Sequence, residues 1–312
     1  MLIDKTDKKD PVDIAIEHVA NSDIHHPLFD IPFLKQFFFG IDLSITKHVF
    51  LLFLVAFITV SSIVFLVQRY ISSKTKIPGK MMSFIEMVIV FLRKDILKGF
   101  IGEKYYKDWE GLVYSLFFFI LIGNFLGLIP IFDLLGLINY LGGGNSNDGT
   151  ILANLTHGGN TVTANINVNF ALALITCCAF TVAGIRKYGF FKHWKNLAPP
   201  GLALPLYLIV IPIEIMAMLI RPLSLTLRLA GNMMGGHLAL IIFTMFIITN
   251  ANVYGNEYSY GYGILAGLGT SIFSVTLSIG IILLEILIAF IQAYVFALLT
   301  AVYIGMAVNV DH

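Results

Sequence analysis

The stretch "HVFLLFLVAFITVSSIVFLV", residues 48–67, has 20 residues and contains no Lys, Arg, Asp or Glu. About 20 consecutive apolar residues let an α-helix cross the hydrocarbon core of a bilayer. Neither this run nor the other apolar runs alternate at period two, as the strands of a membrane barrel would. The stretch therefore predicts a membrane-spanning helix, and with it an all-α integral membrane protein.

The composition of the whole chain favours the same class. Of its 312 residues, 57% are hydrophobic and 12% charged, and the mean hydropathy is +0.84, whereas soluble domains carry about 25% charged residues. A net charge of +1 gives no basic field, so nucleic acid is not expected as a partner. The two cysteines, Cys177 and Cys178, are adjacent in an apolar run and have no metal-ligand spacing. We expect no metal and no cofactor.

Similar runs continue along the chain and predict about five membrane-embedded helices. They cover about residues 48–67, 112–131, 168–185, 204–249 and 264–308. Each of the last two runs is about twice as long as an upright span needs to be. We expect them to be tilted or broken helices that form a hairpin, with bends at Pro205, Pro212 and Pro222 and a polar turn, "NANVYGNEYSYGYG", between them.

The distribution of basic residues predicts the orientation of these helices. Lys and Arg gather in 69–80 and 186–196, whereas the Gly- and Asn-rich loop 132–167 contains neither. Short basic loops stay cytoplasmic, so the segment 1–47 and the loop should lie outside and the C-terminus inside. Residues 81–92 are too short an apolar run to cross, and the segment 81–98 predicts an interfacial helix on the cytoplasmic face. The N-terminus lacks an Arg- and Ser-rich transit pattern, which favours a bacterial inner membrane.

Four ionisable residues interrupt the run 204–249, which includes "LRLAGNMMGGH", residues 227–237. They are Glu214, Arg221, Arg228 and His237. A charge inside a membrane costs at least about 2.5 kcal/mol, so such groups face protein or water and usually mark an ion or substrate path.

Helical spacing sorts these residues by face. Positions seven apart lie on nearly the same helix face, so Glu214, Arg221 and Arg228 form one stripe, which Ser224 and Asn232 extend. Glu214 lies roughly 21 Å from Arg228 along an ideal helix. The counter-charge of Arg228 is therefore expected on another subunit.

In the run 264–308 the only ionisable residue is Glu285, and Gln292 follows one heptad later. The predicted hairpin brings Glu285 back to the region of His237, and a buried acid beside an imidazole is suited to a proton relay. The alternative is that these groups only hold helices together by hydrogen bonds. It applies best to the amides of Gln292 and Asn232.

At this point the sequence resembles a known family. "PLSLTLRLAGNMMGGH" (222–237) followed by "LLEILIAFIQAYVFALLTAVYIGMA" (283–307) is similar to subunit a of the rotary, F-type ATP synthase. "LFFFILIGNFLGLIP" (116–130) and "TANINVNFALAL" (163–174) resemble two further stretches of that family in the same order.

The resemblance implies a static subunit with two aqueous half-channels, which load and unload carboxylates on a rotor ring of c subunits. Arg228 matches the essential arginine that separates the half-channels. His237 and Glu285 match a facing pair where ions enter, and Glu214 matches a polar position near the exit. Weaker or flanking matches are assigned to the remaining candidates: Asn232, Gln292, Arg221, Ser224 and Asn124.

The implied partners are the c ring, b-type peripheral stalk subunits, the rest of the ATP synthase and the bilayer. Ion flow would drive ring rotation and ATP synthesis, and the chain itself would not be an enzyme. H⁺ and Na⁺ both remain open, because the rotor site selects the ion. A self-contained transporter would be expected to show internal repeats, and a membrane enzyme would need a nucleophile, metal cluster or cofactor motif. We find none of these in the sequence.

Overall fold

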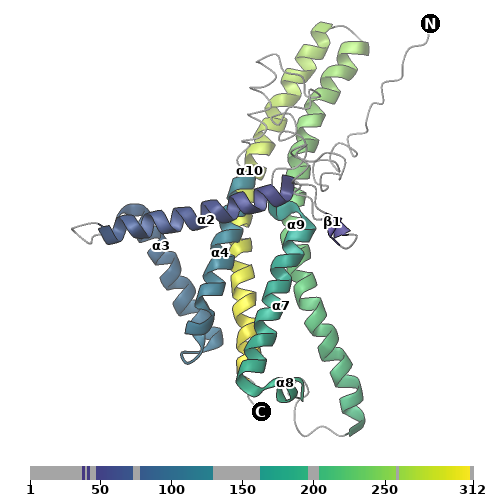
Figure 1. The fold of residues 1–312 in the computed structure, drawn as a ribbon. Helices are drawn as coiled ribbons and strands as arrows, with labels where there is room; N and C mark the ends of the chain where they lie inside the picture. Colours follow the sequence, from purple (N-terminus) through teal and green to yellow (C-terminus); the bar gives the residue numbers. More distant parts are fainter. Residues whose placement is uncertain are drawn as a thin grey trace. The chain divides into compact units, whose positions relative to one another are not determined.

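Helices make up nearly all of the structure, a computed structural model that describes residues 37–38, 41–42, 47–72, 78–128, 162–195, 204–257 and 260–309 (Figure 1). The strands β1 (Phe37–Phe38) and β2 (Ile41–Asp42) form an antiparallel pair with Phe37 opposite Asp42. Most of the predicted N-terminal segment and of the predicted outside loop lies outside the described residues.

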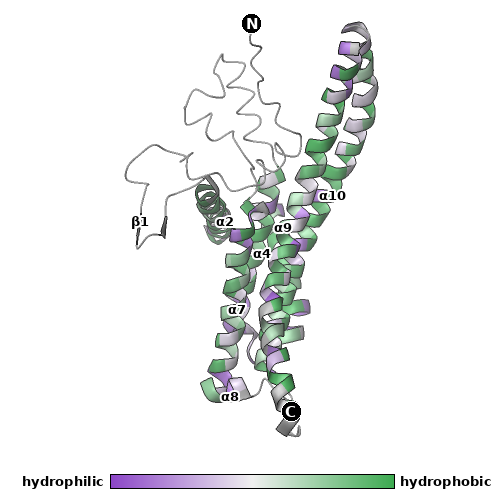
Figure 2. Cartoon of the chain, turned by 90° about the vertical axis from the view of Figure 1, so that its right-hand side faces the viewer, coloured by the Kyte–Doolittle hydropathy of each residue, from purple (hydrophilic) through white to green (hydrophobic). Residues whose placement is uncertain are grey.

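In the described part of the chain, five helices are long and apolar enough to cross a membrane, which confirms the predicted fold class. Figure 2 shows apolar residues along most of their length, with hydrophilic residues at scattered positions. The five are α2 (Lys47–Ser72), α4 (Tyr106–Leu128), α7 (Ile166–Tyr188), α9 (Leu204–Glu257) and α10 (Tyr260–Val308). Shorter helices are α3 (Lys80–Phe91), the π-helix η2 (Leu92–Ile101), the 3₁₀ turn η3 (Val162–Ala164) and α8 (Phe190–Lys195).

The helices α9 and α10 have 54 and 49 residues, or about 80 and 75 Å at about 1.5 Å per residue. The helix α9 continues through Pro212 and Pro222. The helices extend farther into the polar stretch 250–263 than predicted, because α9 reaches Glu257 and α10 begins at Tyr260 within it. A Cβ on Gly263 would lie 2.7 Å from the Cα of Gly255. This close backbone approach packs the two helices together well into the polar sequence.

The chain divides into two compact units. Unit 1 comprises residues 1–53, 124–165 and 230–289, and unit 2 comprises residues 54–123, 166–229 and 290–312. The helices α2, α4, α9 and α10 each contribute to both.

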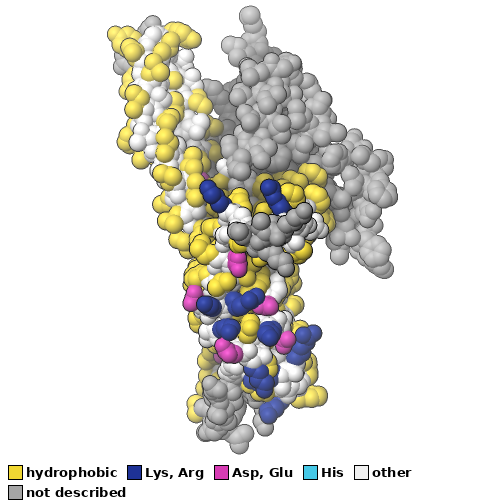
Figure 3. Space-filling model, turned by 90° about the vertical axis from the view of Figure 1, so that its left-hand side faces the viewer, with side chains coloured by type: hydrophobic (Ala, Val, Ile, Leu, Met, Phe, Trp, Pro, Cys, Tyr) yellow, Lys and Arg dark blue, Asp and Glu magenta, His cyan; other side chains and the backbone are white. Residues whose placement is uncertain are grey.

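In unit 2, η2 packs against the end of α10. Four of its apolar side chains are fully buried: Leu92, Ile96, Leu97 and Ile101. The missing side chain of Gly305 brings α10 against the carbonyl of Phe100, and the Asn309 amide donates to the carbonyl of Ile101 at 3.0 Å. Figure 3 shows charged side chains of both signs gathered on one face of the molecule. Within unit 2, η2 forms the ion pairs Arg93–Glu110 and Lys98–Glu103, at 3.4 and 3.0 Å. The interfacial position of this segment stays a prediction.

Candidate functional site

The part of α9 that belongs to unit 2 has a buried face and a polar face. The buried face consists of residues spaced by three and four positions: Pro222, Leu225, Thr226 and Leu229. At 100° per residue, Arg228 lies roughly 110° away from the middle of this face, and its side chain is exposed. Among the residues that the structure describes, Arg228 makes no ion pair.

Arg221, on the same predicted stripe, is paired. Its guanidinium donates to the Glu214 carboxylate at 3.2 Å and lies 5.4 Å from the centre of the Tyr303 ring. This pair was not predicted from the sequence, because side chains on a helix are normally paired at three or four residues' separation. The seven-residue spacing was the available signal. Within unit 2, Arg221 is therefore neutralised by an ion pair, whereas Arg228 is exposed.

Gln292 is a buried polar residue of unit 2, with 3% of its surface exposed. It lies on the face of α10 that is buried through Ala293, Phe296 and Ala297, while Ser224 on α9 is half-buried. A contact that the sequence analysis did not foresee lies farther along α10. The hydroxyls of Thr300 and Thr176 approach to 3.3 Å and join α10 to α7.

In unit 1 the structure gathers three helices around Glu285. The Glu285 side chain is 3% exposed, and neither carboxyl oxygen has a hydrogen-bond partner among the described residues. Its carboxyl lies directly over Gly236 of α9, where an added Cβ would be 2.6 Å from the Glu285 Cδ. Asn124 of α4, fully buried, donates from Nδ2 to the carbonyl of Ala289 at 3.2 Å, one turn beyond Glu285.

The predicted partner of Glu285, His237, is the residue after Gly236 on α9, but its side chain lies outside the described part of the structure. The pairing of His237 with Glu285 stays a prediction. The contact at Gly236 brings the carboxyl to the segment of α9 that carries the imidazole. Asn232, one turn before Gly236, is exposed.

Comparison with known proteins now gives the family. A family profile described as ATP synthase A chain matches residues 49–305. The chain belongs to the ATP synthase A chain family.

Several bacterial relatives of the ATP synthase A chain are similar over most of their length. ATP synthase subunit a of Bartonella henselae is 34% identical over 279 residues, which cover 88% of this chain and 91% of the relative. The protein of the same name from Mesorhizobium japonicum is 31% identical over 277 residues, with the same coverage. ATP synthase subunit a 2 of Chlorobium luteolum is 33% identical over 305 residues, covering 95% and 75%. Together with its spans, these relatives make the chain a multi-pass bacterial membrane protein.

The chain has further buried polar residues, which were not predicted as site residues. Thr163 and Asn165 in unit 1 are 0% and 7% exposed, and Asn169 in unit 2 is fully buried. The repeat Asn165, Asn167, Asn169 at the head of an otherwise apolar span was the signal that could have identified them.

Proposed function

We propose that the chain is the static ion-translocating subunit a of an F-type ATP synthase. Two aqueous half-channels load and unload the carboxylates of the c ring, and Arg228 separates them. Ion flow, of H⁺ or of Na⁺ according to the rotor site, then turns the ring and drives ATP synthesis. The subunit works with the c ring, b-type stalk subunits and the remaining complex, and catalyses no reaction by itself.

The exposure of Arg228 carries this proposal. Arg221 is neutralised by Glu214 within the chain, whereas the exposed Arg228 guanidinium has no ion pair among the described residues. An arginine presented to the outside of a membrane helix needs a carboxylate from a neighbouring subunit, because an unpaired charge in lipid is costly. A guanidinium also keeps its proton under all working conditions, so it can attract an ionised rotor carboxylate while protons pass.

The other polar residues fit the two half-channels. Glu285, with His237 and Asn124, lines the path where ions enter, since this buried carboxyl stands among three helices. Glu214 and Arg221 lie near the exit, and Asn232 and Gln292 flank Arg228 along the two long helices. The segment 1–47 lies outside and the C-terminus lies in the cytoplasm, as the basic clusters indicate.

Replacement of Arg228 tests the proposal. Arg228→Ala should reduce ATP synthesis by energised vesicles to background while the complex still assembles, because the exposed side chain packs little of this chain. Arg228→Lys should also fail or nearly fail, because an ammonium can lose its proton and has a shorter reach. The control Arg69→Ala, which removes an exposed arginine from the last turn of α2, should keep normal synthesis. Substantial synthesis by the Arg228→Ala variant would defeat the proposal.

A further inference from the structure

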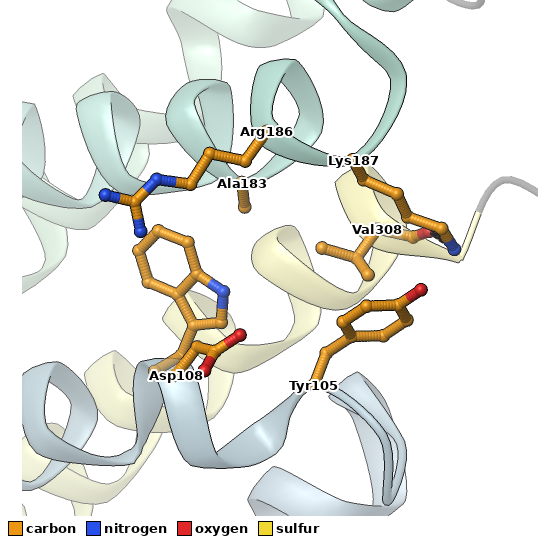
Figure 4. A pocket seen from close by; sticks show the side chains of 7 residues that line it. Tyr105, Asp108, Ala183, Arg186, Lys187 and Val308 are labelled. Atoms are coloured by element: carbon orange, nitrogen blue, oxygen red, sulfur yellow. Dashed lines mark hydrogen bonds between the residues drawn. The ribbon is translucent and has the colours of Figure 1, made fainter.

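A pocket of about 160 Å³ lies in unit 2 where three of the spans end (Figure 4). The helix α4 begins at Tyr106, α7 ends at Tyr188 and α10 ends at Val308. These helix ends supply the lining through Tyr105, Asp108, Trp109, Arg186, Lys187 and Val308. Because the pocket marks the ends of membrane-spanning helices, it lies at the level of the lipid headgroups.

The two cationic side chains of the pocket, Lys187 and Arg186, differ in their contacts. Lys187 Nζ donates to the carbonyl of Val308, which also accepts from the Tyr188 hydroxyl at 2.9 Å. This carbonyl is one of the last acceptors that an α-helix leaves without a backbone partner. Nζ also lies 4.9 Å from the centre of the Tyr105 ring. These contacts fix the ammonium at the edge of the pocket.

Arg186 and Asp108 remain available for a ligand. Figure 4 shows Arg186 and Lys187 on α7, facing Tyr105 and Asp108 across the pocket. Within the described part of the chain, neither Arg186 nor Asp108 makes a side-chain hydrogen bond or an ion pair. Two cationic side chains and one carboxylate give the lining a formal net charge of +1.

We propose that this pocket binds the headgroup of an anionic phospholipid of the phosphatidylglycerol class. Arg186 donates its two parallel N–H groups to the phosphodiester oxygens, a geometry that suits guanidinium and phosphate. Lys187 donates from the other side, and a headgroup hydroxyl donates to the Asp108 carboxylate. Basic pockets between membrane helices bind anionic headgroups, and a single negative charge balances the lining.

The surroundings suit a lipid better than a free anion. The volume equals that of about five waters at about 30 Å³ each, enough for a phosphate and part of a glycerol. Trp109 and Tyr105 are aromatic residues of the kind enriched at the membrane interface. Val182, one turn before Arg186 toward the middle of α7, is 40% exposed. It offers an apolar surface along which an acyl chain can run.

Photo-crosslinking in the intact ATP synthase tests the site. The complex is placed in phosphatidylcholine nanodiscs that contain a small fraction of photoactivatable phosphatidylglycerol, and adducts on peptides 105–112 and 183–192 are quantified by mass spectrometry. Arg186→Gln should lower labelling at least roughly tenfold, as expected for the loss of a bidentate, charge-assisted contact. Arg186→Lys should keep an intermediate level. The matched control Lys192→Gln removes an exposed charge from α8, which does not line the pocket, and should label like the wild type.

Competition separates the possible ligands. Unlabelled phosphatidylglycerol should suppress the adducts, whereas phosphatidylethanolamine and inorganic phosphate at the same concentration should not. Equal labelling of wild type and Arg186→Gln would overturn the proposal. So would an equal loss in Lys192→Gln, which would show general surface attraction. Competition by inorganic phosphate would identify a free-anion site instead and contradict the lipid assignment.

Discussion

The carboxyl group of Glu285 occupies space that Gly236 leaves open on the neighbouring helix. A Cβ at position 236 would overlap one carboxyl oxygen and lie 2.6 and 2.8 Å from Cδ and Cγ. Because the overlapping atoms are the end of a side chain, a methyl group here moves the carboxyl rather than the backbone. The size of the side chain at position 236 thus determines the position of the Glu285 carboxyl group.

Gly236→Ala should therefore slow coupled ion transport while the complex assembles normally. Overpacking of this kind costs about 1–3 kcal/mol, and alanine would otherwise favour the helix. ATP-driven pumping in inverted vesicles, normalised to assembled complex, measures the effect. Adding Glu285→Asp, which shortens the side chain, should restore part of the rate. In the control Gly269→Ala, the added Cβ has no described atom within 4 Å, so the pumping rate should not change. Unchanged pumping in Gly236→Ala would show that the position of the carboxyl does not matter.

The pairing of His237 with Glu285 makes a second prediction. Glu285→Ala should slow pumping severely, because it removes the carboxyl. His237→Glu should also impair it, because two neighbouring carboxylates repel when both are ionised. The exchange variant, with both substitutions His237→Glu and Glu285→His, should recover a measurable part of the rate. If the exchange variant pumps no better than the worse single variant and the two effects add, the residues act separately.

These residues show how far the sequence predicts the site. Arg228 and Glu285 could be chosen because a charge inside an apolar run is costly and therefore informative. The role of Gly236 could not be predicted, since it depends on which face of α10 packs against it. The Glu214–Arg221 pair was missed because it spans two helical turns and depends on the reach of the arginine side chain.

At the scale of elements, the His193 side chain of α8 packs against α7. Gly189, with φ of +82°, lies between the two helices in a left-handed conformation that suits glycine. This turn places the His193 ring over Gly184, where an added Cβ would lie 3.2 Å from the ring Cγ. The imidazole is 7% exposed, and its burial lowers the pKa of His193 below the ordinary value.

The docking of α8 should therefore weaken in acid. The undocked imidazole, with a pKa of about 6.5, binds a proton more readily than the buried one, so stability rises with pH across this window. As the pH falls below about 6.5, the equilibrium constant for docking of α8 should decrease by up to about tenfold per pH unit. The decrease should stop once the pH is below the lowered pKa of the docked His193. A spin label at position 191, with Cys177 and Cys178 replaced by alanine, reports this as a growing mobile signal. His193→Leu should abolish the dependence, and a line shape independent of pH in the wild type would refute it.

The membrane-spanning helices were predictable from the length of the apolar runs in the sequence. Each predicted span lies largely within one of the helices α2, α4, α7, α9 and α10. The contact between η2 and α10 was not predictable, because Phe100 meets Gly305, which lies some 200 residues later in the chain. The short connection between α9 and α10 was missed for a similar reason, since contact through Gly255 and Gly263 keeps a polar sequence helical.

For the molecule as a whole, the proposed function requires that Arg228 faces the c ring. At 100° per residue, Arg228 and Thr226 lie about 160° apart around α9. Thr226 is 1% exposed and its hydroxyl donates to the Pro222 carbonyl at 2.8 Å, whereas Arg228 is exposed. A rotor that contacts this helix should therefore meet position 228 and not position 226.

Disulfide crosslinking in membranes measures this directly. Arg228→Cys is combined with a cysteine at the position of the rotor carboxylate, and the matched control places Thr226→Cys beside the same rotor cysteine. After mild oxidation, a crosslink between subunit a and subunit c should form in the Arg228→Cys pair, with only background in the Thr226→Cys pair. Crosslinking from position 226 that equals or exceeds that from 228, in complexes that assemble equally well, would contradict the proposed orientation of Arg228.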